Sequence, residues 1–307
     1  MGAHRFRDRL DKGEILLLDG AIGTELQRRG AAMDTVAWCA VANKSHPDLL
    51  RQIHLDYIEA GADLITANTF STARHVLEAA GLGDETERIN REAVRLARQA
   101  VERSGRDVLI AGSMSSTRPL DEPPTRPVGA RVATSYREQA SLLADEGVDV
   151  IVAEMMVDVL NASLVLDAAR ETGLPVLVGW SASPGDDGRA VPYRSVRQDA
   201  PTPYTFMELM ERAVSLGGDV LGIMHSNVAV TGPALEVLSR HWQGPLMAYA
   251  ETGWFEPPNW VFAETTSPTD YGDMAREWID LGVSIVGGCC GTTPEHISRL
   301  SAELKPV

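Results

Sequence analysis

Eight short apolar segments recur along the chain of 307 residues, and each precedes a stretch in which apolar residues return at three- and four-residue spacing. Several of the segments are unbroken apolar runs, as at 15–18, which is typical of parallel strands covered on both faces. We expect the strands at residues 15–20, 63–70, 108–114, 148–155, 175–182, 220–226, 245–251 and 284–290. Eight strand–helix units predict an α/β fold, a single (β/α)8 TIM barrel. An open, doubly wound sheet is the alternative, because the number of strands does not prove closure.

Proline and glycine mark the ends of the expected helices. A helix at 47–60 begins with Pro47 and stops before Gly61, and one at 158–172 stops before Gly173. No linker separates two cores, so we expect residues 1–307 to form one domain. Two longer segments, 115–129 and 183–203, follow the third and fifth strands, and we expect them to cover a substrate as lids.

Composition limits the partners of the chain. Lys and Arg total 28 against 43 Asp and Glu, a net charge of −15, which repels nucleic acid and anionic lipid surfaces. No apolar run approaches the roughly 20 residues of a membrane helix, and the first ten residues do not resemble a signal peptide. With only three cysteines, two of them adjacent, a cytoplasmic location is expected. Small-molecule substrates are the expected partners, and homo-oligomerisation is left open.

In a barrel, polar residues at the carboxyl ends of the strands face one shared cavity. Nearly every expected strand supplies such a residue here. The set is Asp19, Asn68, Thr69, Ser113, Glu154, His225, Glu251, Cys289 and Cys290.

The strongest local pattern is the segment 287–296, a strand end that turns through glycines into a helix. Its adjacent thiols, Cys289 and Cys290, can both reach a cavity because the flanking glycines let the backbone approach it. Cysteines are also often simply buried, and neighbouring ones can form a vicinal disulfide. Composition alone leaves metal, redox and structural roles open.

This segment resembles the C-terminal zinc-binding motif of the homocysteine S-methyltransferase family. Residues 18–26 are similar to the opening strand and turn of that family, 54–63 and 65–70 to its second unit, and 111–113 with the strand end at Glu154 to its third and fourth. The resemblance covers nearly the whole chain. It implies an S-methyltransferase that uses Zn²⁺ and methylates homocysteine to methionine.

The resemblance also implies which residues hold the zinc. The family uses three cysteines; Cys289 and Cys290 match two of them, but His225 stands in place of the third. Two cysteines and a histidine are a recognised zinc set with an open fourth position, so we predict all three residues as ligands. The alternative is that His225 is a structural residue packed in the core. Three thiolates give the site a net charge of −1, whereas two thiolates and a neutral imidazole give 0, which makes the metal a stronger Lewis acid.

Asp19 and Glu154 match family positions near the amino group of homocysteine, and we predict them as catalytic and substrate-binding carboxylates. Their alternative role is to cap a helix or to pair with a cation of the barrel. The expected substrate-binding set further contains Thr24, Trp38, Asn68, Thr69, Ser113 and Glu251. The stretch 247–253 departs from the usual Tyr-Pro-Asn of the family, so orientation of the acceptor can differ.

The methyl donor is the least defined substrate. No G-x-G-x-x-G element follows a strand, so no nucleotide cofactor site is predicted. Aromatic faces for an onium donor are available from Trp38, Trp180, Tyr249 and Trp254, although packing is the commoner fate of such residues. Met155 stands where the betaine-using branch has a tyrosine, which favours S-methylmethionine or S-adenosylmethionine over betaine.

Two other classes of function stay open at this point. One is a zinc lyase or hydrolase of the same fold, acting on a different substrate because His225 replaces a cysteine. The other is a metal-free protein in which Cys289 and Cys290 form a disulfide. Cys39 has no partner at metal-ligand spacing and is interpreted as an incidental thiol.

Overall fold

The computed structural model describes residues 2–116, 129–193 and 203–304. Eight strands form one sheet in the order β1-β12-β9-β8-β5-β4-β3-β2, and neighbouring strands run parallel. A parallel bridge between Leu18 and Leu64 joins the two ends of this order, and the amide of Asp19 donates to the carbonyl of Leu64 at 2.9 Å. The sheet therefore closes into the expected (β/α)8 barrel, and the open sheet is excluded.

All eight strands lie in the segments expected from the sequence, to within one residue at either end. Their bounds are β1 (Leu16–Leu17), β2 (Leu64–Ala67), β3 (Leu109–Ser115), β4 (Val150–Met156), β5 (Val176–Trp180), β8 (Val220–Asn227), β9 (Leu246–Glu251) and β12 (Val283–Gly288). The first strand is short because the chain turns at Gly20 into the helix that begins at Ile22.

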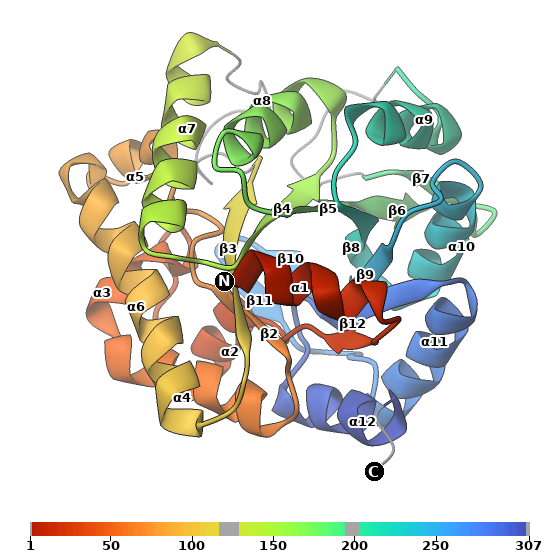
Figure 1. Ribbon diagram of the computed structural model, residues 1–307, viewed down its shortest axis with the longest axis horizontal. Coiled ribbons are helices and arrows are strands. Elements are labelled where there is room, and N and C mark those ends of the chain that lie inside the picture. Colours follow the sequence, from red (N-terminus) through yellow and green to blue (C-terminus); the bar gives the residue numbers. More distant parts are fainter. Residues whose placement is uncertain (1, 117–128, 194–202, 305–307) are drawn as a thin grey trace.

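Helices surround the barrel, as Figure 1 shows. They are α2 (Ile22–Arg28), α3 (Ala42–Ser45), α4 (Pro47–Glu59), α5 (Arg74–Ala79), α6 (Thr86–Ser104), α7 (Ala130–Asp145), α8 (Val159–Arg170), α9 (Phe206–Leu216), α10 (Val228–Ser239), α11 (Pro268–Asp280) and α12 (Pro294–Leu304). Helix α8 begins where Asp158 accepts a hydrogen bond from the amide of Asn161 at 2.8 Å. Within the described residues, none of the helices combines the length and apolarity needed to span a bilayer.

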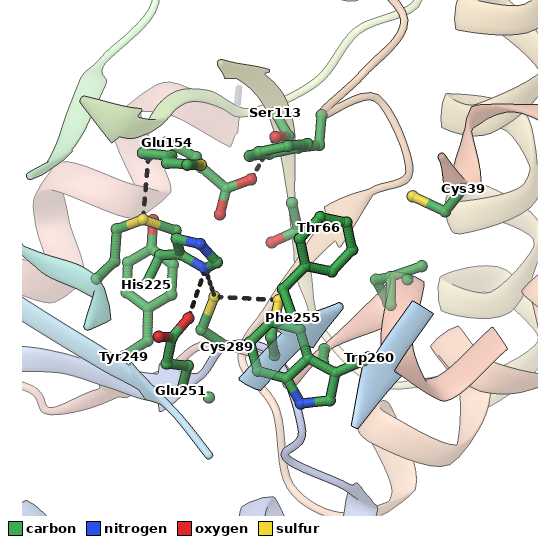
Figure 2. Close-up of a pocket in the computed structure, with 18 of the residues that line it drawn as sticks. Cys39, Thr66, Ser113, Glu154, His225, Tyr249, Glu251, Phe255, Trp260 and Cys289 are labelled. Atoms are coloured by element: carbon green, nitrogen blue, oxygen red, sulfur yellow. Dashed lines mark hydrogen bonds and ion pairs between the residues drawn. The ribbon is translucent and has the colours of Figure 1, made fainter. Parts of the chain in front are cut away.

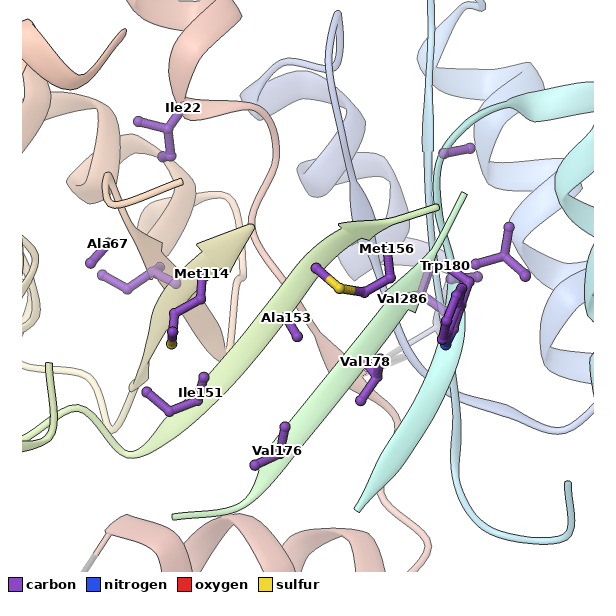
Figure 3. Close-up of a cluster of buried hydrophobic side chains, with 14 of the residues drawn as sticks. Ile22, Ala67, Met114, Ile151, Ala153, Met156, Val176, Val178, Trp180 and Val286 are labelled. Carbon is purple, nitrogen blue, oxygen red and sulfur yellow. The ribbon is translucent and has the colours of Figure 1, made fainter. Parts of the chain in front are cut away.

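The core has two layers. One fills the inside of the barrel, and the other lies between the sheet and the helices. Figure 3 shows part of the second layer, with Met114, Ile151, Val178 and Trp180 packed along β3, β4 and β5. Alternating side chains of one strand thus enter opposite layers, as expected for strands buried on both faces.

An additional helix, α1 (Gly2–Asp11), lies across the amino ends of the strands (Figure 1). Its Phe6 is fully buried and belongs to the layer inside the barrel. Three arginines of α1 pair with aspartates that precede β2, β4 and β8, namely Arg9–Asp63, Arg5–Asp149 and Arg7–Asp219. The second oxygen of each aspartate accepts a backbone N–H of the neighbouring strand at 2.8 Å. Helix α1 therefore closes this end of the barrel, and the carboxyl end is left for chemistry.

Two hairpins lie at the carboxyl end and were not expected from the sequence. The first pairs β6 (Ala182–Pro184) with β7 (Ala190–Pro192), and the second pairs β10 (Trp254–Glu256) with β11 (Asn259–Val261). Of the two expected lids, residues 117–128 and 194–202 lie outside the described residues. The described part of the segment 183–203 contains most of the first hairpin.

Candidate metal centre and substrate cavity

The carboxyl ends of the strands line a cavity of about 410 Å³. Its charged side chains are carboxylates, and the described part of the lining contains no Lys or Arg. The acidic members are Asp19, Glu154 and Glu251, and the thiols are Cys39, Cys289 and Cys290. The cavity is therefore acidic in composition, and no Lys or Arg of the described lining pairs with its carboxyl groups.

Two bulges turn side chains into this cavity. Strands β4 and β8 both shift register near their carboxyl ends, between Ala153 and Met156 and between Met224 and Asn227. Within each bulge one residue other than glycine has a positive φ, 56° at Met155 and 43° at His225. Such a conformation is costly for these residue types and clusters at functional sites. The second bulge places His225 in the cavity lining.

The loop after β12 holds the two adjacent thiols by backbone contacts. The amide of Cys289 donates to the carbonyl of Ala250 at 2.9 Å, and the amide of Thr252 donates to the carbonyl of Cys290 at 2.8 Å. Gly291 has a φ of 82°, and a Cβ atom there would lie 1.9 Å from the carbonyl oxygen of Thr252. Only glycine permits this close approach, so this turn requires glycine at position 291.

His225, Cys289 and Cys290 converge at the cavity wall, as Figure 2 shows around the labelled His225 and Cys289. Their ligand atoms all lie within 4.8 Å of one another. Nδ1 of His225 lies 3.7 Å from Sγ of Cys289, and the two sulfurs are 3.9 Å apart. Tetrahedral zinc with ordinary bond lengths places such atoms about 3.6–3.8 Å apart. The three side chains therefore fit one tetrahedral metal ion and leave a fourth position.

The charges around this cluster favour thiolate chemistry. The hydrogen bond with Cys290, helped by the imidazole of His225, lowers the pKa of Cys289 to about 6. Burial opposes a positive imidazole, but the carboxylate of Glu251 overrides it and raises the pKa of His225 well above its usual value. One thiolate is thus available near neutral pH even without a cation.

Asp19 and Glu154 both line the cavity, and each is held by a neighbour; Figure 2 shows Glu154 beside Ser113. The carboxylate of Asp19 accepts from the amide and the hydroxyl of Thr66 at 2.8 and 3.0 Å. The carboxylate of Glu154 accepts from the hydroxyl of Ser113. Burial raises the pKa of Glu154 to about 7 and that of Asp19 well above its usual value. A cationic group bound beside them would favour the charged form of both carboxyl groups, and the described lining supplies no Lys or Arg for this role.

Aromatic side chains form another wall of the cavity. The ring of Trp38 packs edge-on against the rings of Phe70 and Phe255, with ring centroids 6.1 and 6.4 Å apart. Phe255 stacks on Trp260 with a centroid distance of 6.3 Å. The sequence pointed to Trp38 but missed Phe255 and Trp260, because only the hairpin β10–β11 brings them over the strand ends. It also missed Tyr193, whose hydroxyl lies 3.2 Å from Nε2 of His225. Trp254 and Tyr249 line the cavity, whereas Trp180 is buried in the layer between sheet and helices.

Three of the residues predicted to bind substrate form hydrogen bonds with other residues of the protein. The hydroxyl of Thr24 accepts from the amide of Gly291 at 3.0 Å, so it braces the thiol loop. Thr69 donates to the carbonyl of Ser113 at 2.8 Å and does not line the cavity. Asn68 lines the cavity, but its amide nitrogen donates to Asn43 and its oxygen accepts from Cys39. Their predicted contacts with substrate stay predictions.

Comparison with known proteins decides the family. The protein-family model described as "Homocysteine S-methyltransferase" matches residues 16–304. The chain belongs to the homocysteine S-methyltransferase family. Membership confirms the family and the enzyme class, an S-methyltransferase, that were expected from the sequence.

This family member is similar to relatives along nearly its whole length. It is 25% identical to homocysteine S-methyltransferase YbgG of Bacillus subtilis, over 95% of each chain. It is 26% identical to selenocysteine Se-methyltransferase of Brassica oleracea, over 96% of this chain and 90% of the relative. The metallated homocysteine methyltransferase MmuM of Escherichia coli superimposes with a TM-score of 0.72 at 23% identity, over 96% of this chain and 98% of MmuM. That last likeness supports the barrel fold.

Proposed function

We propose that this enzyme transfers a methyl group from a sulfonium donor to the thiol of homocysteine, at a zinc ion held by His225, Cys289 and Cys290. The observation that carries the proposal is the convergence of three donor atoms within 4.8 Å at the wall of an acidic, aromatic cavity. Relatives named for homocysteine and for selenocysteine support a thiol or selenol acceptor. Zinc, when bound, supplies the Lewis acidity that keeps an acceptor thiol deprotonated at neutral pH.

The chain's own residues bind and orient the acceptor. Asp19 and Glu154 are the carboxylates available to pair with the ammonium group of an amino acid, and the negative cavity favours the charged form of that group. Thr66 and Ser113 fix the two carboxylates by hydrogen bonds before substrate arrives. Because these contacts exist beforehand, the acceptor loses orientational freedom at binding and not during the transfer step.

The charge of the cavity favours a sulfonium amino acid as donor. S-methylmethionine and S-adenosylmethionine each carry a net positive charge at neutral pH, whereas betaine is neutral overall. The described lining has three carboxylates and no Lys or Arg, and two thiolates with a neutral imidazole leave a zinc centre without net positive charge. The faces of Trp38, Phe255 and Trp260 can attract the onium group by cation–π interaction and keep water from the transferred methyl.

A methyl-transfer screen with zinc analysis tests the proposal. The reduced protein is purified, its zinc content is measured by mass spectrometry, and it is incubated with homocysteine, selenocysteine or cysteine together with S-methylmethionine, S-adenosylmethionine or betaine. We expect about one zinc per chain, because the described residues contain one cluster of three donor side chains. We expect methionine only with homocysteine and a sulfonium donor. A zinc-loaded protein that is silent with every pair refutes the substrate assignment.

Variants locate the metal. His225→Ala and Cys289→Ser are expected to lose zinc and methyl transfer together. Cys39→Ser is the matched control, since this thiol lines the same cavity but donates to Asn68 and stands outside the cluster. Unchanged zinc in the first two variants would remove the proposed ligand set.

The other functions left open by the sequence are separated by the same experiment. Consumption of a donor in the absence of acceptor indicates a hydrolase or lyase. Two thiols that titrate only after reduction of a zinc-free protein indicate a disulfide between Cys289 and Cys290. The cytoplasmic location and the single-domain organisation rest on composition and segment pattern, and both are part of this proposal.

A further inference from the structure

His225 brings two possible ligand atoms to the proposed metal cluster. Its Nδ1 lies 3.7 Å from Sγ of Cys289 and 2.8 Å from Oε2 of Glu251, and its Nε2 lies 3.2 Å from the hydroxyl of Tyr193. A thiolate offers a metal one donor atom, whereas an imidazole offers two, and the proton of the neutral ring can lie on either nitrogen. The hydrogen bond made by one nitrogen decides which of the two binds a metal. The partner of Nε2 is therefore a part of the site.

Tyr193 is the polar partner of Nε2. Besides the contact of its hydroxyl, its ring packs against the imidazole of His225 with the centroids 5.5 Å apart and the planes at 45°. The ring of Trp260 also contacts the imidazole, with a centroid distance of 6.3 Å. The indole N–H of Trp260 is already used, because it donates to the carbonyl of Thr252 at 2.8 Å. Among the described residues, the hydroxyl of Tyr193 is thus the group that can hold the proton of Nε2.

The hairpin of β6 and β7 is anchored beside His225. Ala182 of β6 lies opposite the last residue of β7, which directly precedes Tyr193. The amide of Ala182 donates to the hydroxyl of Ser226 at 2.8 Å, and the same hydroxyl donates to a carbonyl of the β8 bulge at 2.8 Å. The hairpin and the bulge are therefore joined at the residue next to His225. This joint fixes the backbone on both sides of the contact between Tyr193 and His225.

The contact with Tyr193 also selects the orientation of the ring. A half-turn of the imidazole about its Cβ–Cγ bond would exchange Nδ1 with Cδ2 and Nε2 with Cε1. The hydrogen bond to Tyr193 would then be lost, and a carbon atom would face Cys289 in place of Nδ1. In the observed orientation, coordination through Nδ1 leaves the proton on Nε2, where the phenol oxygen can accept it. Metal-bound histidines usually have such a partner on the second nitrogen.

On these grounds we infer that Tyr193 is a positioning residue of the metal site: its hydroxyl keeps the proton of His225 on Nε2 and so selects Nδ1 as the nitrogen that binds zinc. The inference rests on the metal site proposed above. It gives the hairpin between β5 and β8 a role in metal binding, although the cluster of donor side chains contains no residue of the hairpin. A cysteine at position 225 would need no such partner, because its single sulfur has no alternative donor atom.

Two measurements on Tyr193→Phe test this role, since the variant loses the hydroxyl and keeps the ring that packs on His225. Its zinc affinity, measured by chelator competition, is expected to fall by about 10-fold, as for loss of an outer partner of a metal ligand. Nuclear magnetic resonance of the zinc-loaded protein with nitrogen-labelled histidine is the second measurement. The wild type should show zinc on Nδ1 of His225 and a proton on Nε2, and this proton should exchange with water faster in the variant. A loss of stability alone would not change this exchange.

Tyr204→Phe is the matched control. Tyr204 follows Tyr193 in the same connection between β7 and α9, but its ring packs on Arg212 and it does not line the cavity. This variant is expected to bind zinc like the wild type. Zinc on Nε2 of His225 in the wild type, or equal zinc affinity in Tyr193→Phe and wild type, overturns the inference and leaves the proposed function intact. Absence of zinc from the wild type overturns both.

Discussion

The hydroxyl of Ser113 donates a hydrogen bond to the carboxylate of Glu154 across the neighbouring strands β3 and β4. Ser113 is a neutral donor, and the side chain of Glu154 is only 9% exposed. Because burial dominates, the pKa of Glu154 is raised from 4.5 to about 7. The substrate-free protein therefore carries a carboxyl group that titrates near neutral pH.

The raised pKa predicts a specific dependence of stability on pH. The folded state binds the proton of Glu154 more tightly than the unfolded state, so this contribution to stability is full below about pH 4.5 and is lost as the pH rises through about 7. The loss amounts to about 3 kcal/mol at 1.36 kcal/mol per unit of pKa. In urea unfolding of the reduced, metal-free protein, the stability of Glu154→Gln relative to the wild type should thus increase by about 2.5 kcal/mol between about pH 5 and about pH 8.

The exposed substitution Glu256→Gln serves as the control for this experiment and should follow the wild type at every pH. Parallel curves for Glu154→Gln and wild type would show that Glu154 ionises at its ordinary value. The buried carboxylate would then be stabilised by a positive partner in the substrate-free protein.

The strands could be placed from the sequence because each is a short apolar segment, several of them unbroken apolar runs, with polar or thiol residues near its carboxyl end. The rule that parallel strands share one carboxyl edge also brought His225 and the pair Cys289–Cys290 to one place, and the structure groups them within 4.8 Å. Closure of the barrel came only with the bridge between Leu18 and Leu64.

The remaining parts of the site depend on contacts that a sequence does not display. The bulges at Met155 and His225 use positive φ angles without the glycine that would signal them. Phe255 and Trp260 reach the cavity because the short hairpin of β10 and β11 carries them there. Tyr193 follows another hairpin and meets His225 across 32 positions of chain.

The stack of Phe255 on Trp260 predicts a donor-specific defect. Phe255→Leu keeps an apolar side chain but removes the aromatic face. A cation–π contribution of about 0.5–2 kcal/mol corresponds to a rise of about 2- to 30-fold in the KM for a sulfonium donor. The KM for homocysteine, measured at saturating donor, should stay within about 2-fold. An equal rise for both substrates would point to a general distortion of the cavity.

Phe6 predicts a loss of stability without a loss of metal. This side chain of α1 is fully buried inside the amino end of the barrel, at the opposite end from the site. Phe6→Ala should reduce the free energy of unfolding by about 3–5 kcal/mol, and the zinc content of the folded protein should not change. His4→Ala alters an exposed residue of the same helix and should be close to wild type. A small effect of Phe6→Ala would mean that α1 contributes little to the closed barrel.

Replacement of His225 by cysteine tests the effect of charge at the proposed metal site. His225→Cys gives the cluster three thiolates, so a bound zinc site carries −1 in place of 0. We expect this variant to retain stoichiometric zinc, unlike His225→Ala. Its bound acceptor sulfur should also be more electron-rich, which should raise the rate of methyl transfer from a given sulfonium donor.

Zinc analysis by mass spectrometry and initial rates at saturating homocysteine check both expectations, with His225→Ala as the comparison. A His225→Cys variant that has lost its zinc, or that transfers the methyl group more slowly than the wild type, would contradict the charge argument.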